Sequence, residues 1–187
     1  TGESKEEFHR FLAGEAGKDG VSSNLYTALP LYTISEELFQ NILERNHIPA
    51  EKQQMLLQEL RREKDNFLQT LQSGSVEDRI PALSREEYAE MPLALSLSEA
   101  FYEHEICCTY DEYLEHYHQT MAFAEHNPNY TVLSQHTRIF RNIQIRIKHS
   151  ERVVISKNKS PVIHFVIRHP KMRKAIEDGL WQVLNEE

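Results

Sequence analysis

The chain has 187 residues and a net charge of −8, with 40% hydrophobic and 27% charged residues, a composition that allows a globular domain with a substantial core. No apolar run is long enough to cross a membrane, and the first 20 residues are too polar for a signal peptide. The two cysteines, Cys107 and Cys108, are adjacent. Because a disulfide between neighbours is strained, a reducing cytoplasm is the expected compartment.

Residues 1–34 are expected to form a flexible amino-terminal segment, since four of the six glycines lie among charged residues before position 21. A weak helix is predicted within it, around Glu6–Leu12. Ser35 then caps a helix that begins with two acids, and Pro49 suits the first turn of a longer helix from Ala50 to about Ser73.

The long helix carries a stripe with 3-and-4 spacing, interrupted by one lysine: Leu57, Leu60, Lys64, Phe67 and Leu71. Such a stripe either packs inside a helical subdomain, residues 35–92, or pairs with a second copy of the chain. Both alternatives stay open on the sequence alone.

A short helix capped by Ser84 follows, and the stretch after Pro92 fits a strand or a helix equally well. The next helix begins at Thr109 or Asp111 and ends before Pro128. Its apolar face is predicted to consist of Tyr110, Leu114, Tyr117, Met121 and Ala124.

Residues 143–148 alternate between isoleucine and polar side chains, which is the period of a strand with one buried face. Residues 152–156 and 161–167 are predicted as further strands, and Pro170 begins the last helix. The predicted fold class is therefore α+β, with N-terminal helices followed by a small, mainly antiparallel sheet and a C-terminal helix. Residues 93–187 form a sensor-like domain in this division.

Charge is divided sharply along the chain. Residues 1–137 carry 10 Lys/Arg and 24 Asp/Glu, a net of −14, whereas residues 138–174 carry 11 Lys/Arg and one Glu, a net of +10. The basic segment either packs against the acidic helices of its own chain or binds an anionic partner.

A small anionic effector is the ligand that this segment suggests. Alternation predicts that Ile163, Phe165 and Ile167 pack on helices, which leaves His164 and Arg168 on the opposite face of the strand. The candidate ligand-binding residues are Arg146, His164, Arg168, His169 and Lys171.

No metal, cofactor or catalytic residue is expected. The cluster of His104, Cys107, Cys108, His116 and His118 matches no zinc-finger spacing, and His116 and His118 point away from each other on a helix. A cysteine nucleophile would need an activating base, for which His104 is the nearest candidate, and an orienting acid is not evident. The paired acids at helix starts are explained by the helix dipole.

Direct DNA binding is not expected from the helices at 38–60 either. Their spacing has a helix-turn-helix rhythm, but the second helix begins with Glu51 and carries few basic residues for phosphate contacts.

Three stretches resemble a known family: "LALSLSEAFYEHEICCTYDEYLEHYHQ", "FRNIQIRIKH" and "ERVVISKNKSPVIHFVIRHPKMRKAIED". They are similar to the C-terminal regulatory regions of bacterial XRE-type (phage-repressor-like) helix-turn-helix transcriptional regulators. The resemblance covers mainly residues 93–180 and carries over no catalytic residue. It implies that DNA is bound only through an N-terminal domain that is absent from this chain.

The sequence therefore predicts a non-catalytic regulatory domain, for effector binding or oligomerisation, of a cytoplasmic, homodimeric transcriptional regulator. The alternative is an enzyme or binding protein for a small anionic ligand, with His104, Cys107 or Cys108 as the reactive groups.

Overall fold

The computed structural model describes residues 20–26, 28–90, 92–95, 106–135, 143–157 and 163–185. Its helical elements are the 3₁₀ turn η1 (Leu31–Thr33), α2 (Glu36–Arg45), α3 (Ala50–Ser73), α4 (Arg85–Glu90), α5 (Tyr110–Glu125) and α6 (Pro170–Asn185). Its strands are β1 (Gly20–Leu25), β2 (Gly74–Pro81), β3 (Tyr130–Gln135), β4 (Ile143–Lys148), β5 (Arg152–Lys157) and β6 (Ile163–Ile167). The fold class is α+β, as the sequence predicted.

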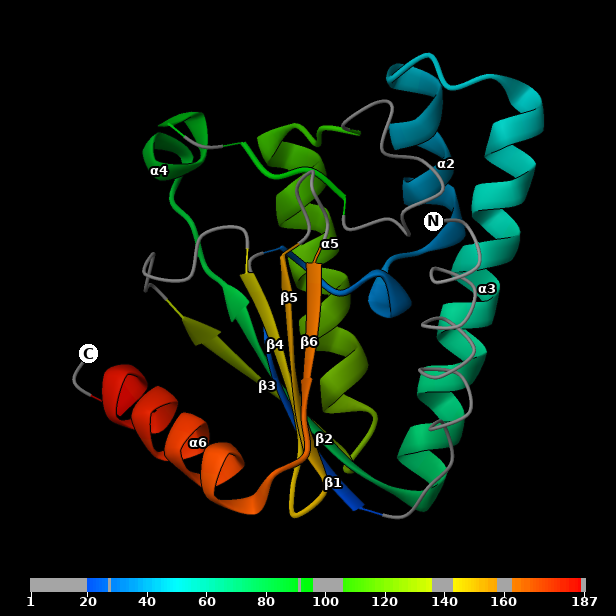
Figure 1. Ribbon diagram of the computed structural model, residues 1–187. Coiled ribbons are helices and arrows are strands. Elements are labelled where there is room, and N and C mark those ends of the chain that lie inside the picture. Colours follow the sequence, from blue (N-terminus) through cyan, green and yellow to red (C-terminus); the bar gives the residue numbers. More distant parts are fainter. Residues whose placement is uncertain are drawn as a thin grey trace.

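The strands of the described residues form one mixed sheet in the order β3-β2-β1-β4-β5-β6 (Figure 1). Strands β1, β2 and β3 are parallel to one another. Strand β4 runs antiparallel to β1, and β5 and β6 continue the antiparallel pairing. The connection from β3 to β4 therefore crosses to the other side of β1, which places the reversal of strand order between β1 and β4.

The sheet combines strands from all three of the divisions predicted from the sequence. Strand β1 comes from the supposed flexible segment 1–34, and β2 comes from the supposed helical subdomain 35–92. Both pair at the centre of the sheet with strands from 93–187. Parallel pairing joins segments that are far apart in the chain, so the local pattern of either strand carries little sign of it.

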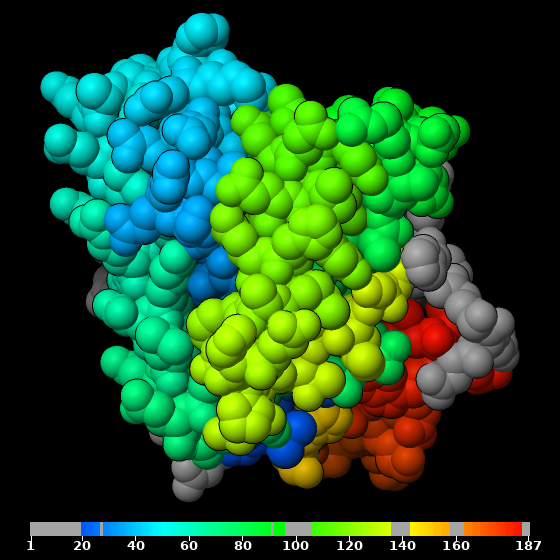
Figure 2. All heavy atoms as spheres, turned by 180° about the vertical axis from the view of Figure 1, so that it is seen from behind, coloured from blue at the N-terminus to red at the C-terminus, as the bar shows by residue number. Residues whose placement is uncertain are grey.

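Helices cover both faces of the sheet (Figure 1). On one face, Leu180 and Leu184 of α6 pack against Ile145, Ile147 and Val153. On the opposite face, Phe67 and Leu71 of α3 pack with Val76 and Tyr130, and Phe123 of α5 joins them. Seen from behind, α5 lies between the α2–α3 pair on one side and the region of α6 on the other (Figure 2).

The stripe of the long helix is buried inside the chain itself. Leu60 is 1% exposed and packs in a core with residues of α2, while Phe67 and Leu71 pack against the sheet. Leu56 is buried as well, and Leu57 is partly buried. These side chains pack within their own chain, so the structure does not support the alternative that the stripe pairs with a second copy.

Local signals set several of the element boundaries. Ser35 Oγ accepts a hydrogen bond from the Leu38 amide at 3.1 Å and caps α2. Thr109 and Glu112 form a reciprocal capping box at the start of α5. Gly74 ends α3, and a Cβ there would lie 2.1 Å from the carbonyl oxygen of Gly20, so only glycine allows β2 to begin beside β1.

The buried face of α5 differs from the predicted one. Its fully buried side chains are Tyr113, His116 and Thr120, whereas Tyr110 and Leu114 are only partly buried. The difference arises because a hydrogen-bonded contact with η1, rather than apolar packing alone, lies on that side: Thr120 Oγ1 is 2.7 Å from Thr33 Oγ1.

The outer strand β6 also differs from the prediction. Ile167 packs against the core beneath α6, but Phe165 is 58% exposed and Ile163 is 39% exposed. The reason is the course of α6, which runs from the end of β6 towards β2, where Arg79 lies 5.0 Å from the ring of Trp181. The beginning of β6 is thus left uncovered by α6.

Within the described part of the chain, no helix combines the length and the apolar composition needed to cross a bilayer.

Candidate functional site

The basic residues expected to bind an anion lie in three separate places. Arg146 is in the middle of β4 and His164 is at the start of β6, whereas Arg168, His169 and Lys171 are exposed at the junction of β6 and α6. Arg146 pairs with Val154, which in turn pairs with Val166, so two strand spacings, about 10 Å, separate the backbones of β4 and β6. The five residues do not form a single site.

Arg146 points into a polar region of the sheet face that α3 covers. With its amide oxygen turned towards the guanidinium, Gln144 accepts from Arg146 Nε at 2.9 Å and from Nη2 at 3.1 Å. The guanidinium carbon lies 6.0 Å from the ring centre of Tyr26. On the neighbouring strand β1, Asn24 pairs directly with Arg146.

A fully buried carboxylate, Asp78 of β2, lies next in this region. Asn24 Nδ2 donates to Oδ1 of Asp78 at 2.7 Å, and Tyr130 donates to Oδ2 at 2.8 Å. Tyr32 of η1 donates to the same Oδ2 and is 3.0 Å from the hydroxyl of Tyr26. Three donors from three different elements therefore compensate the burial of this side chain, which is 0% exposed.

Aromatic rings enclose the carboxylate on the α3 side. The ring of Tyr32 stacks on Phe67 with centres 3.8 Å apart and 15° between the planes. Phe67 meets Tyr130 edge-on at 5.0 Å, and Phe123 lies 5.7 Å from Tyr130. These contacts exclude water and fix the positions of the two tyrosines that donate to Asp78.

Burial raises the pKa of Asp78 from 3.8 to about 6, and the hydrogen bonds from Tyr32, Asn24 and Tyr130 together with the charge of Arg146 limit the rise. Burial, and then the Asp78 charge, raise the pKa values of Tyr26, Tyr32 and Tyr130, so these phenols stay protonated as donors. Burial lowers the pKa of Arg146, but neighbouring groups, chiefly Tyr26 and then Glu63, outweigh it and raise the pKa above its ordinary value.

The polar side chains continue as a row across one face of the sheet, which we call the polar row: Asp78, Asn24, Arg146, Gln144, Ser156 and His164. Ser156 pairs with Gln144 on one side and with His164 on the other. His164 Nδ1 lies 2.9 Å from Ser156 Oγ. A hydrogen-bonded or directly paired neighbour thus links each member to the next, from β2 to the outer strand β6.

The position of the polar row is typical of ligand sites. It crosses the sheet near the carboxyl ends of β1 and β2 and passes between β1 and β4, where the strand order reverses. In open, mostly parallel sheets with helices on both faces, ligands bind beyond the carboxyl ends of the strands at such a reversal. Sheet interiors are normally apolar, so six neighbouring polar side chains on one face need a reason other than packing.

The members of the polar row that the sequence predicted are Arg146 and His164, and the other four were missed. Asp78 gave no signal, because "GSVEDRIP" reads as a turn-rich stretch rather than as a buried strand. Asn24 lies in the similarly polar "GVSSNL". Only the pairing of the strands shows that these residues share a face with Arg146.

Residues considered for metal or thiol chemistry have structural partners. Burial lowers the pKa of His116 to about 4, and its Nε2 lies 3.0 Å from the carbonyl oxygen of Pro30. Burial raises the pKa of Cys108 to about 12, which makes its thiol a poor nucleophile at neutral pH. Among the described residues no cluster of three potential metal ligands is found, and His104 lies outside them.

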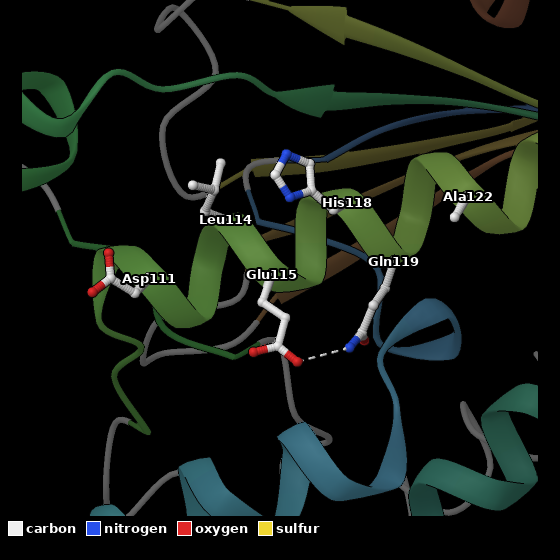
Figure 3. Close-up of a pocket in the computed structure, with 6 residues that line it drawn as sticks. All are labelled: Asp111, Leu114, Glu115, His118, Gln119 and Ala122. Atoms are coloured by element: carbon white, nitrogen blue, oxygen red, sulfur yellow. Dashed lines mark hydrogen bonds between the residues drawn. The ribbon is translucent and has the colours of Figure 1, made fainter.

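A hollow of about 560 Å³ lies along one side of α5 (Figure 3). Its lining comes from a single helix face: Asp111, Leu114, Glu115, His118, Gln119 and Ala122. Gln119 Nε2 donates to Glu115 at 3.2 Å and to Ser35 Oγ at 3.1 Å, so part of the lining serves the contact between α5 and the start of α2. One helix face does not supply the converging groups that a specific small-molecule site needs, which leaves the polar row as the stronger candidate.

Searches of protein-family models, curated proteins and solved structures find no match to this chain. The function has to be inferred from the geometry of the polar row and from the sequence.

Proposed function

We propose that this chain is the non-catalytic, effector-binding domain of a cytoplasmic transcriptional regulator whose DNA-binding domain lies outside the chain. The observation that carries the proposal is the polar row, which crosses the sheet at the reversal of strand order. The resemblance of residues 93–180 to the regulatory regions of XRE-type regulators supports the same conclusion.

The polar row is better suited to binding than to catalysis. Both oxygens of Asp78 are engaged by hydrogen-bond donors, and the side chain is fully buried, so its carboxylate is not placed to accept a proton from a substrate. Gln144 and Ser156 are also buried, so the group of the polar row that a bound molecule would meet is the partly exposed Arg146.

The guanidinium of Arg146 sets the class of effector. It remains charged, and Gln144 occupies two of the five N–H groups that a guanidinium carries. A small molecule with a phosphate or carboxylate would replace the neutral Gln144 amide by a charge-assisted, bidentate partner. The effector is therefore a small anion that competes for Arg146.

Thermal-shift measurements with inorganic phosphate, AMP, glucose 6-phosphate and citrate test this proposal. At least one of these anions should raise the melting temperature of the wild type, and Arg146→Ala should abolish the rise. Arg146→Lys, which keeps the charge but loses the planar fork, provides the second variant should the alanine protein fail to fold.

Arg168→Ala is the matched control, because Arg168 lies at the exposed junction of β6 and α6, outside the polar row. Its response to the same anions should equal that of the wild type. Stabilisation that is lost in Arg168→Ala and kept in Arg146→Ala would move the site to the junction and overturn the assignment. The absence of any stabilisation by the four anions would count against an anionic effector.

A further inference from the structure

The outer strand β6 has a hydrogen-bonded neighbour on only one side among the described residues, since β5 precedes it and the sheet ends with it. Apolar side chains project from both faces of this edge. Phe165 is 58% exposed, Val166 is 40% exposed and Ile163 is 39% exposed. Ile163 and Phe165 lie on one face of the strand and Val166 lies on the other, so the edge is apolar on both faces.

In the part of the chain that the structure describes, this edge lacks the features by which sheet edges normally avoid pairing. Residues 163–167 read "IHFVI" and contain no lysine, no acid and no proline, and the strand has no neighbouring bulge in its pairing with β5. Edge strands that stay unpaired are usually protected by such residues or by a covering element. A neutral, apolar edge of this kind is a surface for strand addition.

We propose that β6 pairs with β6 of a second copy of this chain, antiparallel and around a twofold axis at Phe165, to give one continuous sheet through both copies. In this register Phe165 lies opposite its counterpart. Ile163 lies opposite Ile167, and His164 lies opposite Val166. The strand is self-complementary because the isoleucines at its two ends exchange places, which is the requirement of a twofold interface.

Charge favours antiparallel over parallel pairing of the two strands. Each chain carries a net charge of −8, so two copies repel over most of their surface, but β6 itself has no formally charged residue. The nearest basic group on the strand axis is Arg168. Antiparallel pairing separates the two Arg168 backbones by six residues, about 20 Å, which exceeds the screening length of about 8 Å at physiological salt. Parallel pairing would place them side by side.

The size of the contact predicts its strength. A pair of five-residue strands with three exposed apolar side chains per copy lies at the small end of specific interfaces. The dimer should therefore dissociate on dilution. This dimer does not depend on the effector proposal, since β6 pairing uses the strand edge and leaves Arg146 untouched.

The first test is the solution mass of the 187-residue chain over roughly a hundredfold range of concentration, by light scattering and sedimentation. The wild type should shift from monomer to dimer as its concentration rises. Phe165→Lys should stay monomeric over the same range and keep the wild-type melting temperature as a monomer, because the side chain is exposed. Met55→Lys is the matched control, since Met55 is 57% exposed on α3, and it should dimerise like the wild type.

The second test locates the axis. In a Cys107→Ser background, which removes the exposed native thiol, Phe165→Cys should form an intermolecular disulfide under mild oxidation, because counterparts on a twofold strand pair have Cβ atoms about 5 Å apart. Met55→Cys in the same background should not cross-link. A wild type that is monomeric throughout, a Phe165→Lys protein that still dimerises, or a dimer without the Phe165→Cys cross-link would each overturn the proposal.

Discussion

Replacing Asp78 by asparagine should remove a pH dependence of stability that the wild type shows. The folded protein holds the Asp78 proton up to about pH 6, whereas the unfolded chain releases it near 3.8, so the folded state binds more protons between these values. The resulting stabilisation is complete below pH 3.8 and is lost as the pH rises through 6. The shift of the Asp78 pKa from 3.8 to about 6, at roughly 1.4 kcal/mol per unit, corresponds to a full stabilisation of about 3 kcal/mol.

Between pH 7.5 and pH 5 the wild type should gain about 1.4 kcal/mol of unfolding free energy relative to Asp78→Asn, because only part of the window is crossed. His116 has the opposite effect: burial lowers its pKa to about 4, so the folded protein is destabilised as the pH falls towards that value. This effect is the same in the wild type and in Asp78→Asn and cancels in the comparison. Urea denaturation followed by the fluorescence of Trp181, the single tryptophan, measures the difference. A difference that stays flat, or that shrinks as the pH falls, would refute the assignment of a raised pKa to Asp78.

Two further predictions concern the core and the thiols. Leu60→Glu should lower the free energy of unfolding, measured by urea denaturation, by on the order of 3 kcal/mol or more, because it buries a charge. Leu68→Glu, at a 44% exposed position of the same helix, should change it little. Equal stability of the two variants would contradict the packing of α3. In a thiol-reagent assay of the native protein, exposed Cys107 should react well before Cys108, and fast reaction of both at neutral pH would contradict the raised pKa of the Cys108 thiol.

The sequence predicted those elements whose burial follows a simple period. The 24-residue helix α3 has its predicted bounds, because apolar spacing, Pro49 and Gly74 all act locally. The alternation in β4 identified the isoleucines that pack beneath α6. Such patterns can be recognised in a single sequence because each depends only on residues that are close together along the chain.

The centre of the sheet could not be predicted in this way. Strands β1 and β2 carry serine, asparagine and acidic residues, and Asn24 and Asp78 form a hydrogen-bonded pair among buried apolar neighbours such as Val76 and Ile80. Burial of the Asp78 carboxylate is compensated by hydrogen bonds from Asn24, Tyr32 and Tyr130, which belong to other elements. None of these distances is encoded in local spacing, so Asp78 and Asn24 could not be assigned to the candidate site before the strand pairing was known.

The most direct test of the effector site is the side-chain Nε–Hε resonance of Arg146 in a ¹H–¹⁵N spectrum, titrated with inorganic phosphate, AMP, glucose 6-phosphate and citrate. Binding at the polar row predicts that the Arg146 resonance shifts with a saturating dependence on at least one anion, while the resonance of Arg168 follows only the weak, linear effect of ionic strength. Saturating shifts at Arg168 with an unmoved Arg146, or no saturating shift at either residue, would contradict the account.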